Sequence, residues 1–113
     1  MTETEVIRAL GALAQELRLR VFRRLVVAGP TGSTPSQLTE ALSVSATALS
    51  FHLKELHHAG LITQERQGRH LIYRASFESM NGLLTYLTDN CCQGKSCQVT
   101  ATDICEMSSE KAS

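Results

Sequence analysis

Four cysteines are clustered near the end of the 113-residue chain. Cys91 and Cys92 are adjacent, Cys97 follows shortly after them, and Cys105 lies further on. Thiolates are the ligands that soft metal ions select, and they are also the groups that oxidants attack. Clustered thiols in a cytosolic chain indicate metal or redox chemistry more often than a disulfide framework. The sequence therefore predicts a thiol-based metal or redox site in this segment.

The rest of the chain has the composition of one globular domain. Apolar residues make up 42% and charged residues 19%, with a formal net charge of zero, which excludes a disordered polyelectrolyte. The longest apolar run near the N-terminus, Leu25–Ala28, is far too short to span a membrane. Glu3 and Glu5 occupy the place of the basic residues that begin a signal peptide. We therefore expect a soluble cytoplasmic protein with no membrane partner.

Positive charge gathers in the middle of the chain. Eight basic and four acidic residues lie between Glu16 and Arg74, a net charge of +4 that suits a local phosphate-facing surface. Aromatic residues make up only 4% and tryptophan is absent, which disfavours a single-strand binder that stacks bases. A solvated helix face remains an alternative for the first four of these basic residues. The eight are Arg18, Arg20, Arg23, Arg24, Lys54, Arg66, Arg69 and Arg74.

Local signals predict helices in the first part of the chain. Thr2 and Glu5 form a capping-box pattern in front of an apolar stripe at helical spacing. A second stripe follows and runs up to a glycine- and proline-containing break at 29–33. The stripes are Val6, Leu10, Leu13 and Leu17, and then Val21, Phe22, Leu25 and Val26.

The next two segments have the pattern of a helix-turn-helix. Thr34–Gln37 combines an N-cap, a proline at the first helical position and a capping box, and opens a short helix that ends near Leu42. Ser45 is a good N-cap for the following helix, which stops at Gly60. His52 flanks the apolar stripe of that helix and suits either packing or phosphate contact. The stripe is Leu49, Leu53 and Leu56, and the opposite side carries Thr47, Ser50 and Lys54.

A predicted hairpin follows the helix-turn-helix. Two strand-like runs, Leu61–Arg66 and Arg69–Arg74, flank a Gln-Gly dipeptide. A two-residue loop at this dipeptide pairs Arg66 with Arg69 and places two guanidinium groups at the hairpin tip. A helix-turn-helix followed by a basic hairpin predicts a winged helix. We therefore expect an α+β, mostly helical fold, in which five helices accompany a β-hairpin wing.

The last predicted helix begins near Ser76 and carries no charge over residues 79–88. Terminal helices with more apolar surface than one small core can bury predict a symmetric homodimer. We expect a winged helix-turn-helix and dimerisation domain over residues 1–90. A cysteine-rich metalloid-binding segment is expected over 91–105, and a flexible tail over 106–113.

Four segments of the chain, in this order and spacing, resemble the ArsR/SmtB family of metal-responsive transcriptional repressors. The resemblance implies a homodimeric winged helix whose terminal helices pair the subunits and whose DNA is released when metal binds. The matching segments are Leu10–Phe22, Ser50–Leu56, Ala59–Ile62 and Arg66–Arg69.

Two sites known in this family are missing from the sequence. The Cys-x-Cys site in the first helix of the helix-turn-helix is absent, because Gln37–Glu40 contains no thiol. The zinc site on the last helix is absent, because Phe77–Asn90 contains no histidine. The chain instead resembles the branch whose last helix ends in a vicinal cysteine pair plus a third cysteine. That resemblance implies As(III) as inducer, with Sb(III) as a second candidate, held by Cys91, Cys92 and Cys97.

The chemistry of these three thiols agrees with that implication. Trivalent arsenic is a soft ion that prefers three thiolates in a pyramid. The five residues from Cys92 to Cys97 span at most about 18 Å when extended, so one chain can easily close the site on itself. Gly94 permits an unusual backbone, and Lys95 favours ionised thiols. We therefore expect a site within one subunit.

Other functions of the thiols remain open alternatives. A Zn²⁺ or Cd²⁺ site with Cys105 as fourth ligand agrees with the count, although adjacent ligands are unusual for zinc. Pb²⁺ is a further thiophilic metal that the protein could sense. A thiol oxidation switch is a second alternative. Metal storage or trafficking would leave the winged helix without a function. A thiol-based arsenate reductase is disfavoured, because it needs an arginine to close its phosphate loop and no arginine follows Arg74.

The prediction is therefore an arsenic(III)-responsive transcriptional repressor and not an enzyme. The apo homodimer binds double-stranded operator DNA, and As(III) bound to the three-cysteine site releases it. Two recognition helices in successive major grooves require an inverted-repeat operator with half-sites about one helical turn apart, or a multiple of it. The expected DNA contacts are Thr47, Ser50, His52 and Lys54 on the second helix of the helix-turn-helix, and Arg66 and Arg69 on the hairpin.

Overall fold

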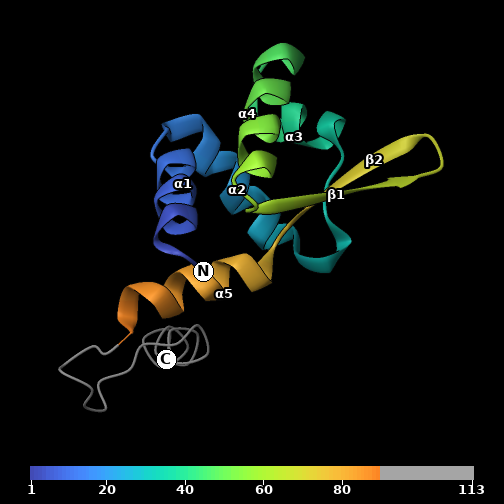
Figure 1. Ribbon diagram of the computed structural model, residues 1–113. Helices are drawn as coiled ribbons and strands as arrows, with labels where there is room; N and C mark the ends of the chain where they lie inside the picture. The colour runs from blue at the N-terminus through green and yellow to red at the C-terminus, as the bar shows by residue number, and fades with distance from the viewer. Residues whose placement is uncertain (90–113) are drawn as a thin grey trace, which may run out of the picture.

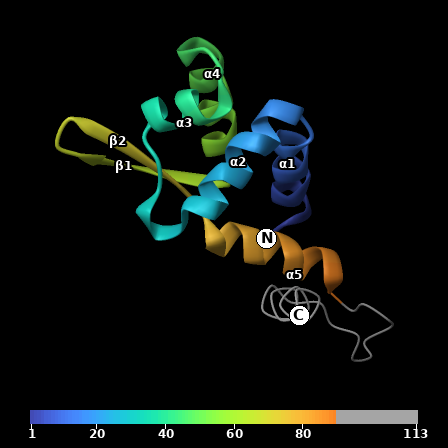
Figure 2. The same cartoon turned by 180° about the vertical axis from the view of Figure 1, so that it is seen from behind.

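The structure, a computed structural model, describes residues 1–89 as five α-helices, one 3-10 helix and a two-stranded antiparallel hairpin. These elements form a winged helix-turn-helix, which confirms the predicted fold class. The helix-turn-helix lies at one side of the molecule, the hairpin projects away from the helices, and α5 lies on the side opposite the helix-turn-helix (Figures 1 and 2). The elements are α1 (Glu3–Leu13), α2 (Glu16–Ala28), η1 (Gly29–Thr31), α3 (Pro35–Leu42), α4 (Ala46–His58), β1 (Ile62–Gln67), β2 (His70–Ala75) and α5 (Phe77–Thr88).

Both predicted capping boxes are confirmed. Thr2 Oγ1 accepts a hydrogen bond from the Glu5 backbone N–H at 3.1 Å, and Glu5 Oε1 accepts one from the Thr2 N–H at 2.8 Å. Thr34 and Gln37 make the same reciprocal pair at 3.2 and 2.9 Å, with Pro35 at the first helical position. Each box satisfies two backbone donors that a helix start leaves without partners, so both helices begin where the sequence predicts.

The first apolar stripe is divided between two helices. Gln15 is the N-cap of α2, and its Oε1 accepts a hydrogen bond from the Arg18 N–H at 2.7 Å. This cap starts a new helix at Glu16, whereas α1 ends at Leu13, so Leu17 belongs to α2. The face of α1 in the core consists of Val6, Ala9 and Ala12, while Leu10 is 42% exposed.

The hairpin loop lies one residue later than predicted, which shifts the pairing partner of Arg66 by two residues. Gln67 pairs with His70, and Arg66 pairs with Leu71, so the two-residue loop is Gly68–Arg69. Gly68 has φ +62°, whereas Arg69 is not among the residues with positive φ. A positive φ at the first loop residue alone is the pattern of a type II′ turn, which favours glycine there. The predicted register required a left-handed Gln67, and this conformation strains a residue with a Cβ atom.

An isolated β-bridge holds the hairpin to the helices. Ser33 and Tyr73 exchange two backbone hydrogen bonds at 2.9 and 2.8 Å, from N–H to carbonyl in each direction. The preceding Gly32 has φ +70°, and a Cβ atom at this position would lie 2.6 Å from the Tyr73 carbonyl oxygen. Gly32 therefore permits the close approach of the η1 loop to β2.

The hydrophobic core lies mainly between α2, α3, α4 and the start of the hairpin. Leu61 is fully buried just after α4, and its carbonyl accepts a hydrogen bond from the Ser76 N–H at 2.8 Å, which ties the start of β1 to the start of α5. None of the described helices is long and apolar enough to span a membrane. The largest fully buried side chains are Val21, Leu25, Leu38, Leu49, Leu56 and Leu61.

Candidate nucleic-acid interface

The outer face of α4 brings together three of the predicted DNA contacts. Ser45 caps the start of the helix, because its Oγ accepts a hydrogen bond from the Ala48 N–H at 3.1 Å. The buried leucines of α4 point to the core, so the opposite side of this helix faces solvent. Thr47, Ser50 and Lys54 are exposed there and line a single surface hollow. These side chains offer two hydroxyl groups and one cation, which suit base edges and phosphates.

Phe51 belongs to the same face and was not predicted to contact DNA. It lines the hollow with the three polar residues and Ala46, and it is 50% exposed. A signal for it is present in the sequence. Positions 47, 50, 51 and 54 follow the spacing of one helix face, so the face that contains Thr47, Ser50 and Lys54 also includes Phe51.

His52, the fourth predicted contact on this helix, is buried with 9% of its surface exposed. Its Nδ1 accepts a hydrogen bond from Arg18 Nε at 3.4 Å. Burial, followed by the positive charge of Arg18, holds the pKa of His52 below its ordinary value of 6.5, against the opposing effect of Glu55. The buried imidazole packs α4 against α2 through Arg18. Packing is one of the two roles that the sequence suggests for this residue. The burial of His52 favours the packing role, and a direct DNA contact by this residue stays a prediction.

Arg18 is not part of a solvated helix face. Besides its bond to His52, its Nη1 donates a hydrogen bond to the Ala12 carbonyl at 3.4 Å. Its guanidinium carbon lies 5.7 Å from the centroid of the Phe51 ring, within the range of a cation–π contact. Arg18 thus connects the end of α1 to α4 and supports the base of the outer face of α4. By contrast, Arg20 is exposed and pairs with Glu16 of its own helix at 2.6 Å.

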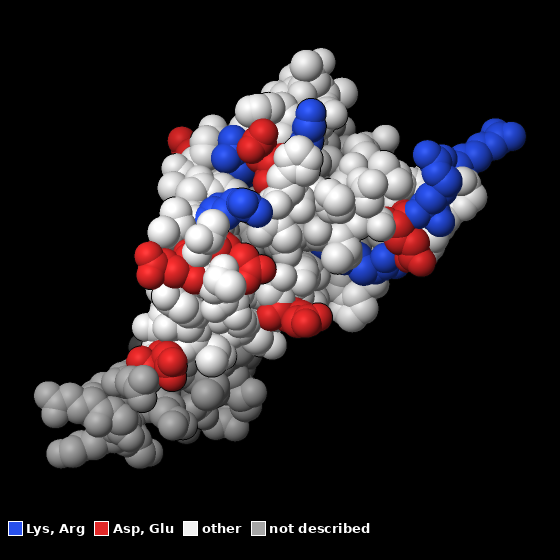
Figure 3. Space-filling model, viewed as in Figure 1, with Lys and Arg blue, Asp and Glu red and all other residues white. Residues whose placement is uncertain are grey.

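The far end of the hairpin carries the two predicted wing arginines. Arg66 and Arg69 are exposed, and Arg69 lies in the two-residue loop itself. Basic side chains cover this end of the molecule (Figure 3). A cationic tip on a projecting hairpin is well placed to reach a phosphate backbone beside the groove that a recognition helix enters.

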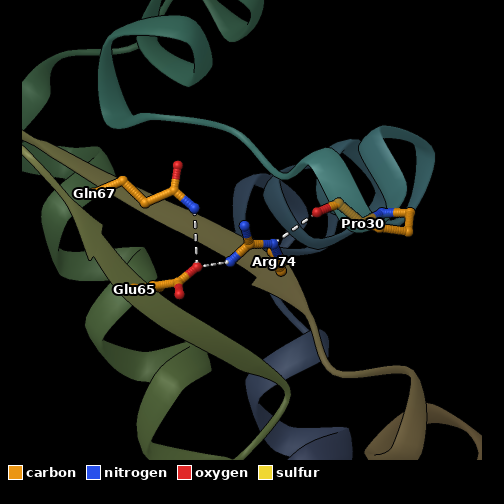
Figure 4. A network of polar contacts seen from close by, with 4 residues as sticks. All are labelled: Pro30, Glu65, Gln67 and Arg74. Atoms are coloured by element: carbon orange, nitrogen blue, oxygen red, sulfur yellow. Dashed lines mark hydrogen bonds and ion pairs between the residues drawn. The ribbon is translucent and has the colours of Figure 1, made fainter.

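A polar network fixes the hairpin relative to the body of the protein (Figure 4). Arg74 Nε donates to the Pro30 carbonyl at 2.7 Å, and Arg74 Nη1 donates to Glu65 Oε1 at 2.8 Å. Gln67 Nε2 donates to the same carboxylate oxygen at 3.1 Å. The hydrogen bonds from Arg74 and then Gln67 lower the pKa of Glu65. One arginine therefore links β1, β2 and the η1 loop.

The predicted metal ligands lie outside the described residues. Cys91, Cys92, Cys97 and Cys105 all follow residue 89, so the three-cysteine site and the segments 91–105 and 106–113 stay predictions. Within residues 1–89, no group of three or more histidine, cysteine, aspartate or glutamate side chains is arranged to hold a metal ion.

The terminal helices α1 and α5 contact one another and leave large apolar side chains exposed. Leu83 of α5 faces the core, while Leu87, one turn further on, is 54% exposed. We use the name apolar terminal face for the exposed large apolar residues of these two helices taken together. Of the two helices, α5 lies on the side of the molecule away from the helix-turn-helix (Figure 1). The members of the apolar terminal face are Ile7 and Leu10 of α1, and Phe77, Tyr86 and Leu87 of α5.

Comparison with known proteins gives relatives that are transcriptional regulators. Residues 13–65 match the family model described as a helix-turn-helix domain. The arsenical resistance operon repressor of Bacillus subtilis is 37% identical over 95 residues, which cover 80% of this chain and 87% of the relative. This range includes the helix-turn-helix, and it extends well beyond the part that the family model matches.

Solved structures of similar proteins have the same fold. The ArsR-like transcriptional regulator from Rhodococcus sp. RHA1 is 30% identical, with a TM-score of 0.67 over 74% of this chain and 76% of that one. A homodimeric winged helix-turn-helix DNA-binding domain from Mycobacterium bovis has a TM-score of 0.62 at 22% identity, over 85% of this chain and 89% of that one. The fold, the exposed face of α4 and the similarity to the Bacillus repressor lead to one conclusion. The chain belongs to the ArsR/SmtB family of DNA-binding transcriptional repressors.

Proposed function

We propose that this repressor binds an inverted-repeat operator as a metal-free homodimer and releases it when As(III) binds to Cys91, Cys92 and Cys97. One observation carries the DNA-binding part of the proposal. The hydroxyl groups of Thr47 and Ser50 and the ammonium of Lys54 share one exposed hollow on the second helix of a helix-turn-helix. A helix of this kind enters the major groove with its first turns against the base edges.

The homodimer is supported by the apolar terminal face. A small monomeric domain rarely leaves so many large apolar side chains uncovered on adjoining helices, whereas a two-fold interface buries the same patch on both subunits. The Mycobacterium bovis domain, which has the same fold, is homodimeric. Pairing through α1 and α5 leaves both copies of α4 and the hairpin free for DNA.

The inducer is supported by the donor set and by the relative. Three thiols are the ligands that a soft trivalent metalloid takes, and the Bacillus protein is an arsenical resistance repressor. The vicinal pair follows α5 directly, since α5 ends at Thr88. Cys91 comes three residues after the end of a helix of the proposed dimer interface. We infer that metalloid binding changes the end of this helix and thereby the spacing of the two recognition helices. Sb(III), with the same preference for thiolates, is the second inducer that we propose.

Arsenite titration of the fully reduced full-length protein tests the site. We expect three thiols per chain to become protected for each arsenic bound, as measured by thiol-reactive dye under native conditions. Cys105→Ser is the matched control and should still protect three thiols, whereas Cys97→Ser should fail to form the three-thiolate site. Saturating arsenite should weaken operator binding about 5- to 150-fold, the usual range for coupling between two sites.

Two results would contradict this assignment in different ways. Protection of four thiols by Zn²⁺, Cd²⁺ or Pb²⁺ but none by arsenite would make the protein a sensor of another thiophilic metal. Operator release by mild oxidation but not by saturating arsenite would make it a thiol redox sensor. In both cases the function as a repressor would stand.

A further inference from the structure

Phe51 is the large apolar side chain on the exposed face of α4. It lies in the second turn of the helix, between the hydroxyl of Thr47 and the ammonium of Lys54, and half of its surface is open to solvent. The core-facing residues of α4 are complete without it, since Leu49, Leu53 and Leu56 fill that side. A phenylalanine in this position adds little to the core, so its role lies on the outer surface.

The ring of Phe51 is held in place from one side. The His52 ring lies with its centroid 5.5 Å away and its plane inclined by 55°, and the Arg18 guanidinium lies 5.7 Å from the Phe51 centroid. His52 is itself fixed by burial and by its bond from Arg18. An aromatic ring supported in this way presents a defined apolar surface to the hollow at a small further loss of conformational entropy on binding.

We propose that Phe51 is a specificity-determining residue that contacts the 5-methyl group of a thymine in each operator half-site. This inference rests on the proposed function, in which α4 enters the major groove. Thymine alone among the four bases presents a methyl group in that groove, and apolar side chains such as phenylalanine recognise it by contact. A recognition helix meets base edges there, so the ring contacts the methyl group and does not stack on a base.

The position of Phe51 favours DNA over a second copy of the chain as the occupant. The residues that we propose for dimerisation lie on α1 and α5, whereas Phe51 lies on α4, and α5 is on the side of the molecule away from the helix-turn-helix (Figure 1). The immediate neighbours of Phe51 in the hollow are Ser50 and Lys54, a hydroxyl and a cation suited to bases and phosphates. Phe51 therefore supplies the apolar component of a surface whose other components are polar.

Replacement of thymine by deoxyuridine tests this contact, because it removes the methyl group and leaves base pairing intact. The operator is first selected with the full-length apo protein from a pool of random duplexes, and each thymine is then replaced singly. We expect one thymine per half-site at which the wild type loses about fourfold in affinity, as expected for one buried methyl group. Replacement in both half-sites should weaken binding about 15-fold.

Variants at two positions identify the protein side of the contact. Phe51→Ala should bind the thymine operator more weakly and should show no further loss with deoxyuridine, whereas Phe51→Leu should retain part of the sensitivity. Thr47→Ser is the matched control, because it removes the methyl group of Thr47 and keeps the hydroxyl. Whatever its effect on overall affinity, this variant should lose affinity on deoxyuridine replacement as much as the wild type does. Circular dichroism of Phe51→Leu and Phe51→Ala confirms folding, which we expect because the side chain is half exposed.

Four other results of these binding experiments would overturn the proposed contact between Phe51 and thymine. Equal sensitivity to deoxyuridine in Phe51→Leu, Phe51→Ala and the wild type would show that another residue contacts the methyl group. Loss of the sensitivity in Thr47→Ser would assign it to Thr47. An operator with no methyl-sensitive thymine would exclude the contact while leaving the repressor function intact. Failure to select any operator would instead contradict operator binding itself, and the inference would fall with it.

Discussion

At His52, burial and a neighbouring charge act on the same ring. The imidazole lies in the core with Nδ1 accepting a hydrogen bond from Arg18, which is possible only when this nitrogen carries no proton. Protonation would remove that bond and place a second positive charge beside the guanidinium. The lowered pKa of His52 reflects this preference for the neutral ring, with burial as the larger cause.

This arrangement predicts a loss of stability in mild acid. A histidine whose pKa is lower in the folded state binds more protons in the unfolded state. The contribution of His52 to the free energy of unfolding is therefore fully present above the ordinary pKa of 6.5. It then falls as the pH drops from 6.5 towards the folded-state pKa, below which this contribution no longer changes. We expect the wild type to have a lower Tm at about pH 5 than at about pH 7.5, measured by thermal unfolding at constant ionic strength.

His52→Gln tests the assignment to this side chain. Glutamine keeps an oxygen that can accept from Arg18 but does not titrate, so part of the pH dependence should disappear. If the variant shows the same difference in Tm between the two pH values as the wild type, the acid sensitivity belongs to other groups.

Among the elements, the hairpin depends most on contacts outside itself. An isolated two-stranded hairpin is marginally stable in water, and here the bridge from Ser33 to Tyr73 and the hydrogen bonds of Arg74 connect it to the body. The hairpin is thus divided into an anchored base and a free cationic tip. Arg74 belongs to the base, although its charge by itself suggests a phosphate contact.

Arg74→Gln should therefore reduce stability. We expect a loss of about 1 kcal/mol in the free energy of unfolding, or about 4–8 °C in Tm, because the interactions are only partly shielded from solvent. Chemical denaturation followed by circular dichroism measures this change.

Arg69→Gln is the matched control at the other end of the hairpin. Arg69 makes no ion pair with another residue of the described part of the chain, so its removal should change stability by less than about 0.5 kcal/mol. Instead it should weaken DNA binding about equally for all sequences and reduce the slope of log affinity against log salt by about 1 for each arginine removed. An unchanged salt slope would contradict a phosphate contact by Arg69.

At the scale of the whole molecule, the surfaces that we propose for DNA and for dimerisation belong to different elements. The polar face of α4 and the hairpin tip suit DNA, whereas the apolar terminal face on α1 and α5 suits a second copy of the chain. This separation allows both contacts to exist at once, as a dimeric repressor requires.

A charge introduced into the apolar terminal face should dissociate the dimer. In Leu87→Glu, a two-fold interface would bury two carboxylates without partners, so we expect dimer affinity to fall at least about 100-fold. Sedimentation velocity should then show monomers at concentrations at which the wild type is dimeric.

Val27→Glu provides the control for this prediction. Val27 is 73% exposed, more than Leu87, but it lies on α2 and outside the apolar terminal face. This variant should remain dimeric, which would show that position and not added charge causes dissociation. A dimeric Leu87→Glu protein would place the interface elsewhere.

Features that depend on neighbouring residues could be predicted from the sequence. The capping boxes at Thr2 and Thr34 are confirmed because their hydrogen bonds join residues only three positions apart. The outer face of α4 was predicted in large part, since helix periodicity alone places Thr47, Ser50 and Lys54 together. The cysteine cluster is also a feature of the sequence, and its chemistry follows from the residue types.

Features that depend on distant contacts were decided by the tertiary structure. The hairpin loop is Gly68–Arg69 and not the predicted Gln67–Gly68, because only glycine takes the required positive φ easily. The bridge to Ser33 also holds β2 in place. His52 and Phe51 are adjacent in sequence, yet one is buried and the other exposed. Helix periodicity accounts for that difference, whereas the hydrogen bond of His52 comes from α2, where Arg18 lies 34 residues away along the chain. No local pattern specifies such a contact, because the energy that selects it comes from surfaces that meet only in the folded protein.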